Sequence, residues 1–345
     1  MTVSDHQMFV KGERATELGE RVLEAVESPP AAARAQVEQL VEGDLRGRPS
    51  HGMQRLPVLV ERIQSGVLSP EAVPRIESTA PGSLAVDGGH CFGPVAIQAV
   101  LPQLADLAHA NGVGIATVRN AGHLGMLSPY LEELAELQTI GIVLTTSEAL
   151  VHPTGGREPM VGTNPIGIGI PLEPCPFVLD MSTAAISAGE VIATRERALR
   201  LPVGAALDAE GRRTTDPEAA LAGAISPFGG PKGYGLALGF ELLVAGLTDT
   251  EVGRAVVGTL DGDKPSTKGD LVIAIDARSL IGGVVRKRLN AYLEELRTAT
   301  PTPGSDGVTI PGDRMRAERQ LRIREGIPYA AATWARLLEL ERAVA

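Results

Sequence analysis

Apolar residues follow a helical period in the first part of the chain. Between residues 13 and 28, and again between residues 31 and 44, they recur at intervals of three and four, and Pro29-Pro30 separates the two segments. This spacing places the apolar side chains on one face of a helix, and a proline pair interrupts a helix because proline has no backbone donor. The pattern therefore predicts two amphipathic helices near the N-terminus.

From about Pro74 the pattern changes to short apolar runs bounded by glycine or proline, which are typical of buried strands. Longer helical patterns lie between several of these runs, so the order of elements predicts a layered α/β sheet. The predicted strands are 83–87, 114–118, 141–145, 166–170 and 177–180, and the predicted helices between them are 95–110, 126–137 and 184–198.

The segment 233–247 is nearly all apolar and too short to span a bilayer comfortably, so it predicts a central buried helix. Beyond it the pattern predicts, in order, a loop at 249–268, a strand at 271–275, and helices near 280–298, 313–325 and 328–343. We expect an α/β fold: a layered mixed β-sheet with flanking helices, and a helical lobe from both termini.

The domain boundaries follow from this order of elements. Residues 76–286 would form the mixed-sheet domain, and residues 1–75 would join residues 287–345 in the helical region. The clearest linker is Pro301-Thr302-Pro303-Gly304, since proline and glycine end regular elements.

Composition and charge narrow the class of protein. The chain has 345 residues and is 43% hydrophobic, which is enough for a sizeable core. Its 32 Lys and Arg residues against 42 Asp and Glu residues give a net charge of −10, which repels a phosphate backbone, so we expect no nucleic-acid partner. The sequence shows no membrane-length apolar run and no secretory signal pattern, so we expect a cytoplasmic protein without a membrane partner.

The two cysteines, Cys91 and Cys175, lie far apart and have no neighbours at metal-ligand spacing. Cytoplasmic cysteines are usually reduced. We therefore expect buried thiols, no disulfide and no zinc.

Residues 44–55, D-L-R-G-R-P-S-H-G-M-Q-R, gather a hydroxyl, an imidazole and guanidinium groups around two glycines. If Ser50 caps a helix that runs through residues 56–65, His51 lies in its first turn and Arg55 one turn further on. A guanidinium suits carboxylate binding, and an imidazole suits proton transfer near neutral pH. The competing interpretation is that Ser50 only caps, His51 only packs and Arg55 only faces solvent.

A Rossmann fold would show G-x-G-x-x-G between a strand and a helix, and that arrangement is missing. The nearest spacing, at 229–235, holds Lys232 between glycines just before the apolar helix. This turn would offer a phosphate a positive charge and the N–H groups of a helix start. A tight turn whose lysine faces water is an equal alternative.

Four further Gly-rich or polar blocks follow the 44–55 segment: N-A-G-H-L-G at 120–125, G-G-R-E-P-M-V-G-T-N-P at 155–165, F-G-G-P-K-G-Y-G at 228–235 and I-P-G-D at 310–313. In this order, the five blocks resemble the malate/L-lactate dehydrogenase family of NAD(P)-dependent oxidoreductases, which is unrelated in fold to the Rossmann-type dehydrogenases. The resemblance extends from about Gly12 to the C-terminal helices.

This resemblance implies a nicotinamide cofactor, either NAD or NADP, and no metal. It assigns the mixed-sheet domain to cofactor binding and the helical region to the substrate. The cofactor contacts that it implies are Ser147, Asp180, Met181, Ser182, Lys232, Gly233, Pro311, Gly312 and Asp313.

The resemblance also places His51 and His123 at the active site without deciding which of them transfers the proton. We favour His51, with Ser50 positioning the substrate or the imidazole and His123 shaping the pocket. Arg55 would bind the substrate carboxylate, with Arg46 as a second candidate. Two weaker candidates, equally consistent with a structural role, are Arg157 and Asn164.

The implied reaction is hydride transfer between NAD(P) and a small 2-hydroxy or 2-oxo carboxylic acid, by a protein that is a homodimer like its family. The chain departs from the family pattern at Leu59, Leu124 and Pro231, where tyrosine, an aromatic residue and histidine are common. A leucine-lined pocket would suit a less polar substrate. The alternatives are therefore a reductase of cyclic imino acids such as piperideine-2-carboxylate, or an inactive family member that acts as a binding protein.

Overall fold

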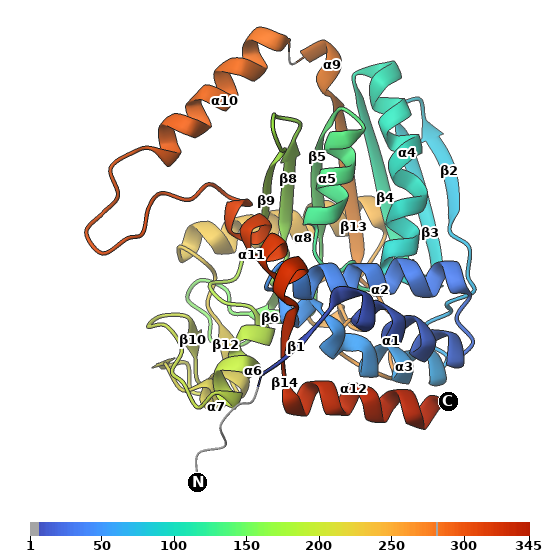
Figure 1. Ribbon diagram of the computed structural model, residues 1–345, viewed down its shortest axis with the longest axis vertical. Coiled ribbons are helices and arrows are strands. Elements are labelled where there is room, and N and C mark those ends of the chain that lie inside the picture. Colours follow the sequence, from blue (N-terminus) through green and yellow to red (C-terminus); the bar gives the residue numbers. More distant parts are fainter. Residues whose placement is uncertain (1–6, 281) are drawn as a thin grey trace.

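A seven-stranded mixed sheet forms the centre of the protein (Figure 1). The computed structural model describes residues 7–280 and 282–345. The strands lie in the order β2 Arg75–Ala80, β3 Ser83–Cys91, β4 Val113–Ala121, β13 Gly269–Asp276, β5 Thr139–Thr145, β8 Ile166–Ile170 and β9 Phe177–Met181. β3 and β4 are parallel and the other neighbours are antiparallel, so the predicted layered mixed sheet is confirmed.

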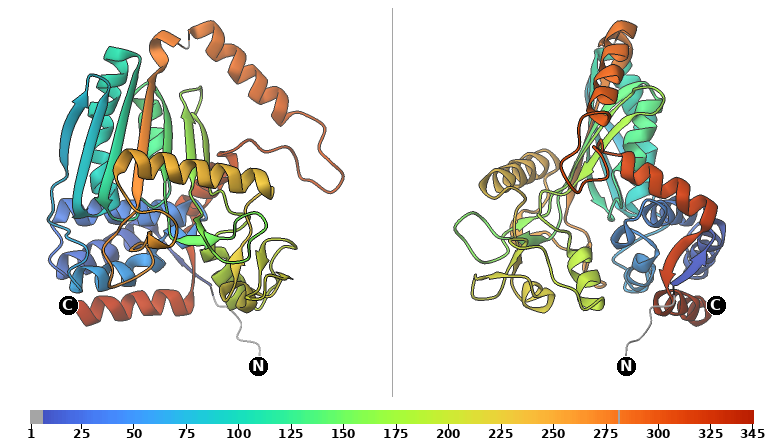
Figure 2. Two further views of the ribbon diagram at one scale, coloured as in Figure 1. Left: turned by 180° about the vertical axis from the view of Figure 1, so that it is seen from behind. Right: turned by 60° about the vertical axis from the view of Figure 1, so that its left-hand side comes forward.

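Helices cover both faces of this sheet (Figure 2). α4 Gly93–Asn111 and α5 Ser128–Glu136 lie on one face, and α8 Pro231–Thr248 lies on the other. The I-G-I-G-I run of β8 shows how the sequence brings α5 close. Gly167 and Gly169 both face α5, and a Cβ on Gly169 would meet the backbone carbonyl of Leu131. The glycines therefore allow the backbone of α5 to approach the strand directly.

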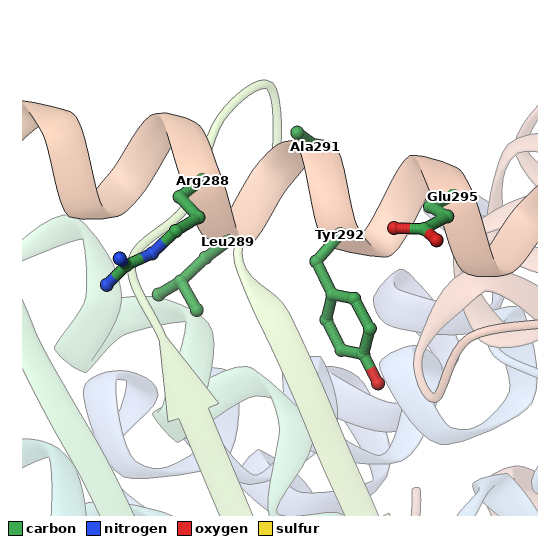
Figure 3. A pocket seen from close by; sticks show the side chains of 5 residues that line it. All are labelled: Arg288, Leu289, Ala291, Tyr292 and Glu295. Atoms are coloured by element: carbon green, nitrogen blue, oxygen red, sulfur yellow. The ribbon is translucent and has the colours of Figure 1, made fainter.

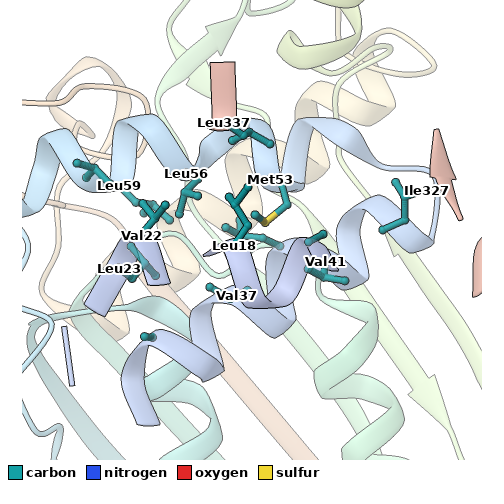
Figure 4. Packing of buried hydrophobic residues seen from close by; sticks show 14 of the residues in the cluster. Leu18, Val22, Leu23, Val37, Val41, Met53, Leu56, Leu59, Ile327 and Leu337 are labelled. Carbon is teal, nitrogen blue, oxygen red and sulfur yellow. The ribbon is translucent and has the colours of Figure 1, made fainter. Parts of the chain in front are cut away.

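The two ends of the chain build a helical lobe under the sheet. It contains α1 Gly12–Ala25, α2 Pro30–Leu45, α3 Leu56–Gln64 and α12 Ala331–Val344, beside a two-stranded sheet of β1 Gln7–Val10 and β14 Ile327–Ala330. These helices share one core, in which Leu18, Met53, Leu56 and Leu337 pack together (Figure 4). Burial of such side chains from distant segments is what holds the N- and C-terminal elements together.

A second, five-stranded sheet lies inside the range 76–286, and the sequence pattern gave no sign of it. Its strands are β11 Arg213–Thr214, β10 Ala206–Leu207, β12 Ala224–Ile225, β6 Ala149–Val151 and β7 Val161–Gly162, accompanied by α6 Ala188–Glu196 and α7 Pro217–Leu221. The proposed division into two domains stays a prediction.

The chain leaves the sheet through α9 Ala277–Leu280 and α10 Gly283–Arg297, then returns through α11 Asp313–Glu325. α10 projects from the body and contains no buried residue (Figures 1 and 2). A shallow open hollow along it contains none of the predicted site residues (Figure 3), and its lining is Arg288, Leu289, Ala291, Tyr292 and Glu295. Among the described residues, no helix combines the length and apolar character needed to cross a membrane.

Several predicted elements need correction. The helix expected at 184–198 begins only at Ala188, where the hydroxyl of Ser187 accepts the N–H of Glu190 and caps it. The helix expected at 328–343 is preceded by β14, because residues 327–330 pair with β1. The single helix expected near 280–298 is the pair α9 and α10, and Ile281 between them lies outside the described residues.

The helix expected at 233–247 exists as α8, but it is not a central buried helix. Only one side of α8 packs on the sheet, and leucines remain on the other side. Cys175 is likewise half-buried rather than buried, whereas Cys91 is buried as expected.

Candidate active site

The loop between α2 and α3 carries three of the predicted catalytic residues. Its backbone forms two 3-10 turns, Pro49–His51 and Met53–Arg55, separated by Gly52 in an extended conformation. A continuous helix cannot pass through that glycine, so α3 begins at Leu56 without a side-chain cap. The prediction that Ser50 caps a helix is therefore wrong. Its Oγ instead lies 3.1 Å from Nδ1 of His51.

Two imidazoles lie together at this loop. The ring centroids of His51 and His123 are 5.5 Å apart. The N–H of Gly125 donates to Nδ1 of His123 at 2.8 Å. Burial, followed by the positive charges of Arg55 and Arg48, lowers the pKa of His51 to about 4, and burial with Arg55 holds the pKa of His123 well below its usual value. Both rings are therefore neutral at pH 7.

Arg55 is the cation beside these rings. Its Nη2 donates to the carbonyl of Thr259 at 2.6 Å, and among the described residues it forms no ion pair. Burial lowers the pKa of Arg55 to about 10, an effect that Glu148 opposes and Arg62 reinforces. The Glu148 carboxylate is itself bound by the N–H groups of Thr259 and Leu260, at 2.6 and 2.9 Å. The positive charge of Arg55 thus lacks a directly bonded anion.

Arg46, the second candidate for the substrate carboxylate, is bound elsewhere. Its Nη1 and Nη2 donate to the two oxygens of Glu132 at 2.8 and 2.6 Å, and its Nε donates to Glu42 at 2.8 Å. Glu42 also accepts from Arg319 of α11 at 2.7 Å. This network joins α2, α5 and α11, and it leaves Arg55 as the better candidate for a substrate.

Several predicted cofactor residues meet where β5 and β9 end. The hydroxyl of Ser147 accepts the N–H of Thr163 at 2.9 Å. Thr183, which follows Ser182, donates its hydroxyl to the carbonyl of Thr163 at 2.8 Å, and its own carbonyl accepts the N–H of Phe228 at 3.0 Å. Ser147, Ser182 and the turn before α8 therefore belong to one connected cluster, although they come from distant parts of the sequence.

The turn before α8 fits a phosphate group. Gly229 and Gly230 have φ values of 57° and 65°, which favour glycine, and the space beside both Cα atoms is open. The first N–H groups of a helix have no acceptor within the helix, and exposed Lys232 adds a positive charge to them. Gly233 is needed for the close packing of this turn, since a Cβ there would overlap the carbonyl of Phe228. A dinucleotide presents phosphates of the kind that such a turn binds.

Two of the remaining predicted cofactor residues, Asp180 and Asp313, already have structural partners. Oδ2 of Asp180 accepts the N–H groups of Leu127 and Ser128, both at 2.9 Å, and so caps the start of α5. Pro311 and Gly312 lead into α11, which begins at Asp313, and Gly312 lies beside the carbonyl of Val178 in β9. The Asp313 carboxylate accepts from Arg297 at 2.8 Å. Their role in cofactor binding stays a prediction, and it would have to use their backbone or remaining acceptor positions.

Comparisons with known proteins show the family of this chain. A family model described as malate/L-lactate dehydrogenase matches residues 10–338. The L-sulfolactate dehydrogenase of Methanocaldococcus jannaschii is 34% identical over 96% of this chain and 96% of its own length. The chain belongs to the malate/L-lactate dehydrogenase family.

Two further members show the range of this family. The Delta(1)-pyrroline-2-carboxylate/Delta(1)-piperideine-2-carboxylate reductase of Pseudomonas aeruginosa is 32% identical over 94% of this chain and 96% of its own length. The crystal structure of a dehydrogenase from Sinorhizobium meliloti has a TM-score of 0.92 and 42% identity, covering 98% of this chain and 99% of that one. Members of the malate/L-lactate dehydrogenase family are enzymes, so this protein is an oxidoreductase of the dehydrogenase class.

Two of the three departures from the family pattern lie in hydrophobic cores, and the third lies at the turn before α8. Leu59 is buried in the core of the helical lobe, and Leu124 is buried in the core between the sheet and its helices. Neither leucine therefore supports the interpretation of an apolar pocket. Pro231 is the first residue of α8, a position at which proline is favoured because that N–H has no helical acceptor.

The sequence analysis did not single out Glu148, and it named Asn164 only as a weaker candidate. Glu148 directly follows Ser147 at the end of a predicted strand, and this position was the available signal for a functional carboxylate. Asn164 is fully buried and binds the N–H of Ser147 at 3.2 Å and the carbonyl of Ala237 at 3.0 Å. Its structural role is therefore the one that the contacts support, while exposed Arg157 makes no comparable contact among the described residues.

Proposed function

We propose that this enzyme transfers hydride between NAD(P) and a small 2-hydroxy or 2-oxo carboxylic acid. The observation that carries the proposal is Arg55, a partly buried guanidinium next to the His51–His123 pair, whose bonded partner is a backbone carbonyl rather than a carboxylate. A guanidinium fork matches the two oxygens of a carboxylate, and a bound carboxylate would place the adjacent carbon beside the imidazoles.

His51 is proposed to move the proton at its Nε2, since its Nδ1 faces the hydroxyl of Ser50 at 3.1 Å. In the oxidation direction the lowered pKa of His51 keeps the ring neutral, so it is ready to accept the hydroxyl proton. In the reduction direction the substrate carboxylate offsets the charge of Arg55. Because Arg55 is one cause of the lowered pKa, binding an anionic substrate raises the pKa of His51 and favours the acid form.

The cofactor is proposed to be NAD or NADP, which supplies or accepts the hydride when bound. Ser147, Ser182 and the first turn of α8 with Lys232 and Gly233 would hold it, because they form one connected cluster with a phosphate-type turn. Further contacts are proposed from Asp180, Met181, Pro311, Gly312 and Asp313. The proton chemistry of His51 requires no metal.

The direct test is a substrate panel. We expect the purified protein to oxidise NADH or NADPH in the presence of at least one 2-oxo acid. The reaction is measured by the loss of absorbance of the reduced nicotinamide. Each cofactor is titrated separately, so the same experiment decides between NAD and NADP. An enzyme that binds neither cofactor by calorimetry and turns over no member of the panel would support the alternative of a binding protein.

Cyclic imino acids belong in the same panel, because the P. aeruginosa relative is named as a reductase of such compounds. They carry a carboxylate beside a C=N bond, so Arg55 and His51 would serve them in the same way. The kcat/KM values for 2-oxo acids and cyclic imino acids, measured side by side, decide which class is the substrate.

We also propose that the protein is a cytoplasmic homodimer. The two free cysteines and the need for a nicotinamide cofactor support the cytoplasm. The outward side of α8 supports a dimer, since its leucines are between 45% and 59% exposed; they are Leu236, Leu242, Leu243 and Leu247. Apolar side chains clustered on one exposed helix face are typical of protein contacts.

Replacing Leu243 and Leu247 together with glutamate should convert the dimer into a monomer, because the substitution buries two charges in the proposed contact. Light scattering coupled to size-exclusion chromatography measures the change in mass. Val203→Glu is the control, since Val203 is 87% exposed and is not part of α8. A monomeric wild-type protein at micromolar concentration would contradict the dimer.

A further inference from the structure

A buried carboxylate lies directly behind the catalytic loop. Asp44, in the last turn of α2, is 2% exposed. Its Oδ2 accepts two hydrogen bonds, one from the N–H of Met53 at 2.9 Å and one from the hydroxyl of Tyr329 at 2.6 Å. The first donor belongs to the catalytic loop and the second to β14 near the C-terminus. Asp44 therefore connects the loop to a distant part of the helical lobe.

The loop packs closely against Asp44 and α2. A Cβ on Gly52 would overlap the Asp44 carboxylate, and a Cβ on Gly43 of α2 would press on the carbonyl of His51. The side chain of Met53 is fully buried among the helices of the lobe (Figure 4). The backbone between His51 and the second 3-10 turn is thus held by the carboxylate on one side and by the core on the other.

The charged and titratable groups around this carboxylate come from three elements. From α11, Arg322 donates Nη1 to the backbone carbonyl of Asp44 at 2.7 Å and pairs with Glu318 at 2.6 Å. From β14 comes Tyr329, and from the loop comes His51, whose backbone lies against α2. Among the described residues, none forms an ion pair with the Asp44 carboxylate. Burial raises the pKa of Asp44 to about 7, although the hydrogen bonds and Arg322 act against this rise.

We propose that Asp44 is a positioning residue of the reaction, and that its ionised carboxylate holds the His51–Arg55 segment in the active arrangement. This inference rests on the function proposed above. An ionised carboxylate accepts stronger hydrogen bonds than its protonated form. Protonation therefore weakens the bond to Met53 and loosens the loop, and small displacements of catalytic groups are costly for the rate.

The negative charge of ionised Asp44 should make the folded protein less stable than the protonated form does. The pKa of Asp44 is raised in the folded protein, so the carboxyl group contributes stability that is present below its unfolded pKa. That contribution is lost as the pH rises towards 7. Activity that depends on the ionised form and stability that depends on the protonated form change in opposite directions with pH, and this opposition separates a positioning role from a merely structural one.

The test compares wild type with Asp44→Asn, which keeps the shape of the side chain but does not ionise. With saturating cofactor, kcat/KM for oxidation of the best hydroxy acid in wild type should fall below about pH 7, well above the pKa of His51. In Asp44→Asn this acidic fall should disappear, and kcat/KM at pH 8 should drop about 10- to 100-fold. The melting temperature of the variant should exceed that of wild type at pH 8 and converge with it at pH 5.

Tyr329→Phe is the second variant, because it removes one donor to the carboxylate and leaves the acid in place. Loss of a bond to the ionised form should raise the pKa of Asp44, so the acidic fall in kcat/KM should move to higher pH. Unchanged pH profiles in both variants would overturn the proposal while leaving the dehydrogenase function intact. A wild-type protein without turnover in the substrate panel would instead overturn the function itself.

Discussion

Replacing His51 with alanine should reduce kcat for the best 2-oxo acid by about 10²- to 10⁴-fold, which is the usual contribution of a general acid or base. The ring centroids of His51 and His123 are 5.5 Å apart and Arg55 is close by, so the change removes the proposed proton donor and leaves the proposed carboxylate contact in place. KM for the 2-oxo acid and the affinity for the cofactor should therefore change little. Steady-state kinetics and cofactor fluorescence titration measure both quantities.

His123→Ala is the matched control for this experiment, because it removes an imidazole of equal size from the same pocket. We expect a smaller loss of kcat, since Nδ1 of His123 accepts the N–H of Gly125 and its pKa is held well below the usual value. If His51→Ala retains turnover while His123→Ala abolishes it, the proton transfer belongs to His123 and the assignment made here is wrong.

Most of the central sheet could be predicted because those strands are apolar and buried, whereas the edge strand β2, which is mostly exposed, was missed. Runs such as G-I-V-L-T at 141–145 and I-G-I-G-I at 166–170 carry enough apolar residues between turn signals to indicate strands, and all five runs predicted before α8 are strands in the structure. The small sheet could not be predicted, because strands of two or three residues are too short to show a period. β14 was missed for another reason, namely that its partner β1 lies at the other end of the chain.

The sequence pattern nominated the residue types of the candidate site, which stay a prediction, but it did not predict the conformation of the loop that carries them. The pattern S-H-G-x-x-R suggested a capped helix, whereas Gly52 separates two 3-10 turns and the Asp44 carboxylate occupies the space beside it. The sequence also could not show which arginine is available to bind a substrate. Arg46 is bound by Glu132 and Arg55 by a carbonyl of the 259–260 segment, and partners so distant in sequence leave no local signal.

The positive charges around the loop have one common effect. Arg48 and Arg55 both lower the pKa of His51 after burial, and Arg55 and Arg62 both act on His123. A site with this excess of positive charge binds an anion favourably. The bound anion then raises the lowered pKa values of the two imidazoles towards the usual value for histidine. In the proposed mechanism, substrate binding and activation of the proton donor are therefore coupled through Arg55.

Replacing Arg55 with glutamine should raise KM for the 2-oxo acid at least 30-fold, because loss of a buried charged hydrogen-bond partner costs about 2 kcal/mol or more. Its removal should also raise the pKa of His51, since Arg55 is the largest cause of the lowered pKa after burial. The midpoint of the pH profile for reduction should then move to higher pH. Arg55→Lys should give an intermediate KM, because it keeps the charge but loses the fork.

Arg46→Gln is the matched control, an arginine-to-glutamine change in the same sequence block. Because Arg46 is bound to Glu132 and Glu42, this variant should melt at a lower temperature than wild type and keep the KM of wild type. The reverse pattern, with an unchanged KM in Arg55→Gln and a raised KM in Arg46→Gln, would mean that the ion-pair network opens in solution to admit the substrate. The guanidinium of Arg55 would then serve only to hold the 259–260 segment, and the carboxylate site would have to be placed against α2 and α5 instead.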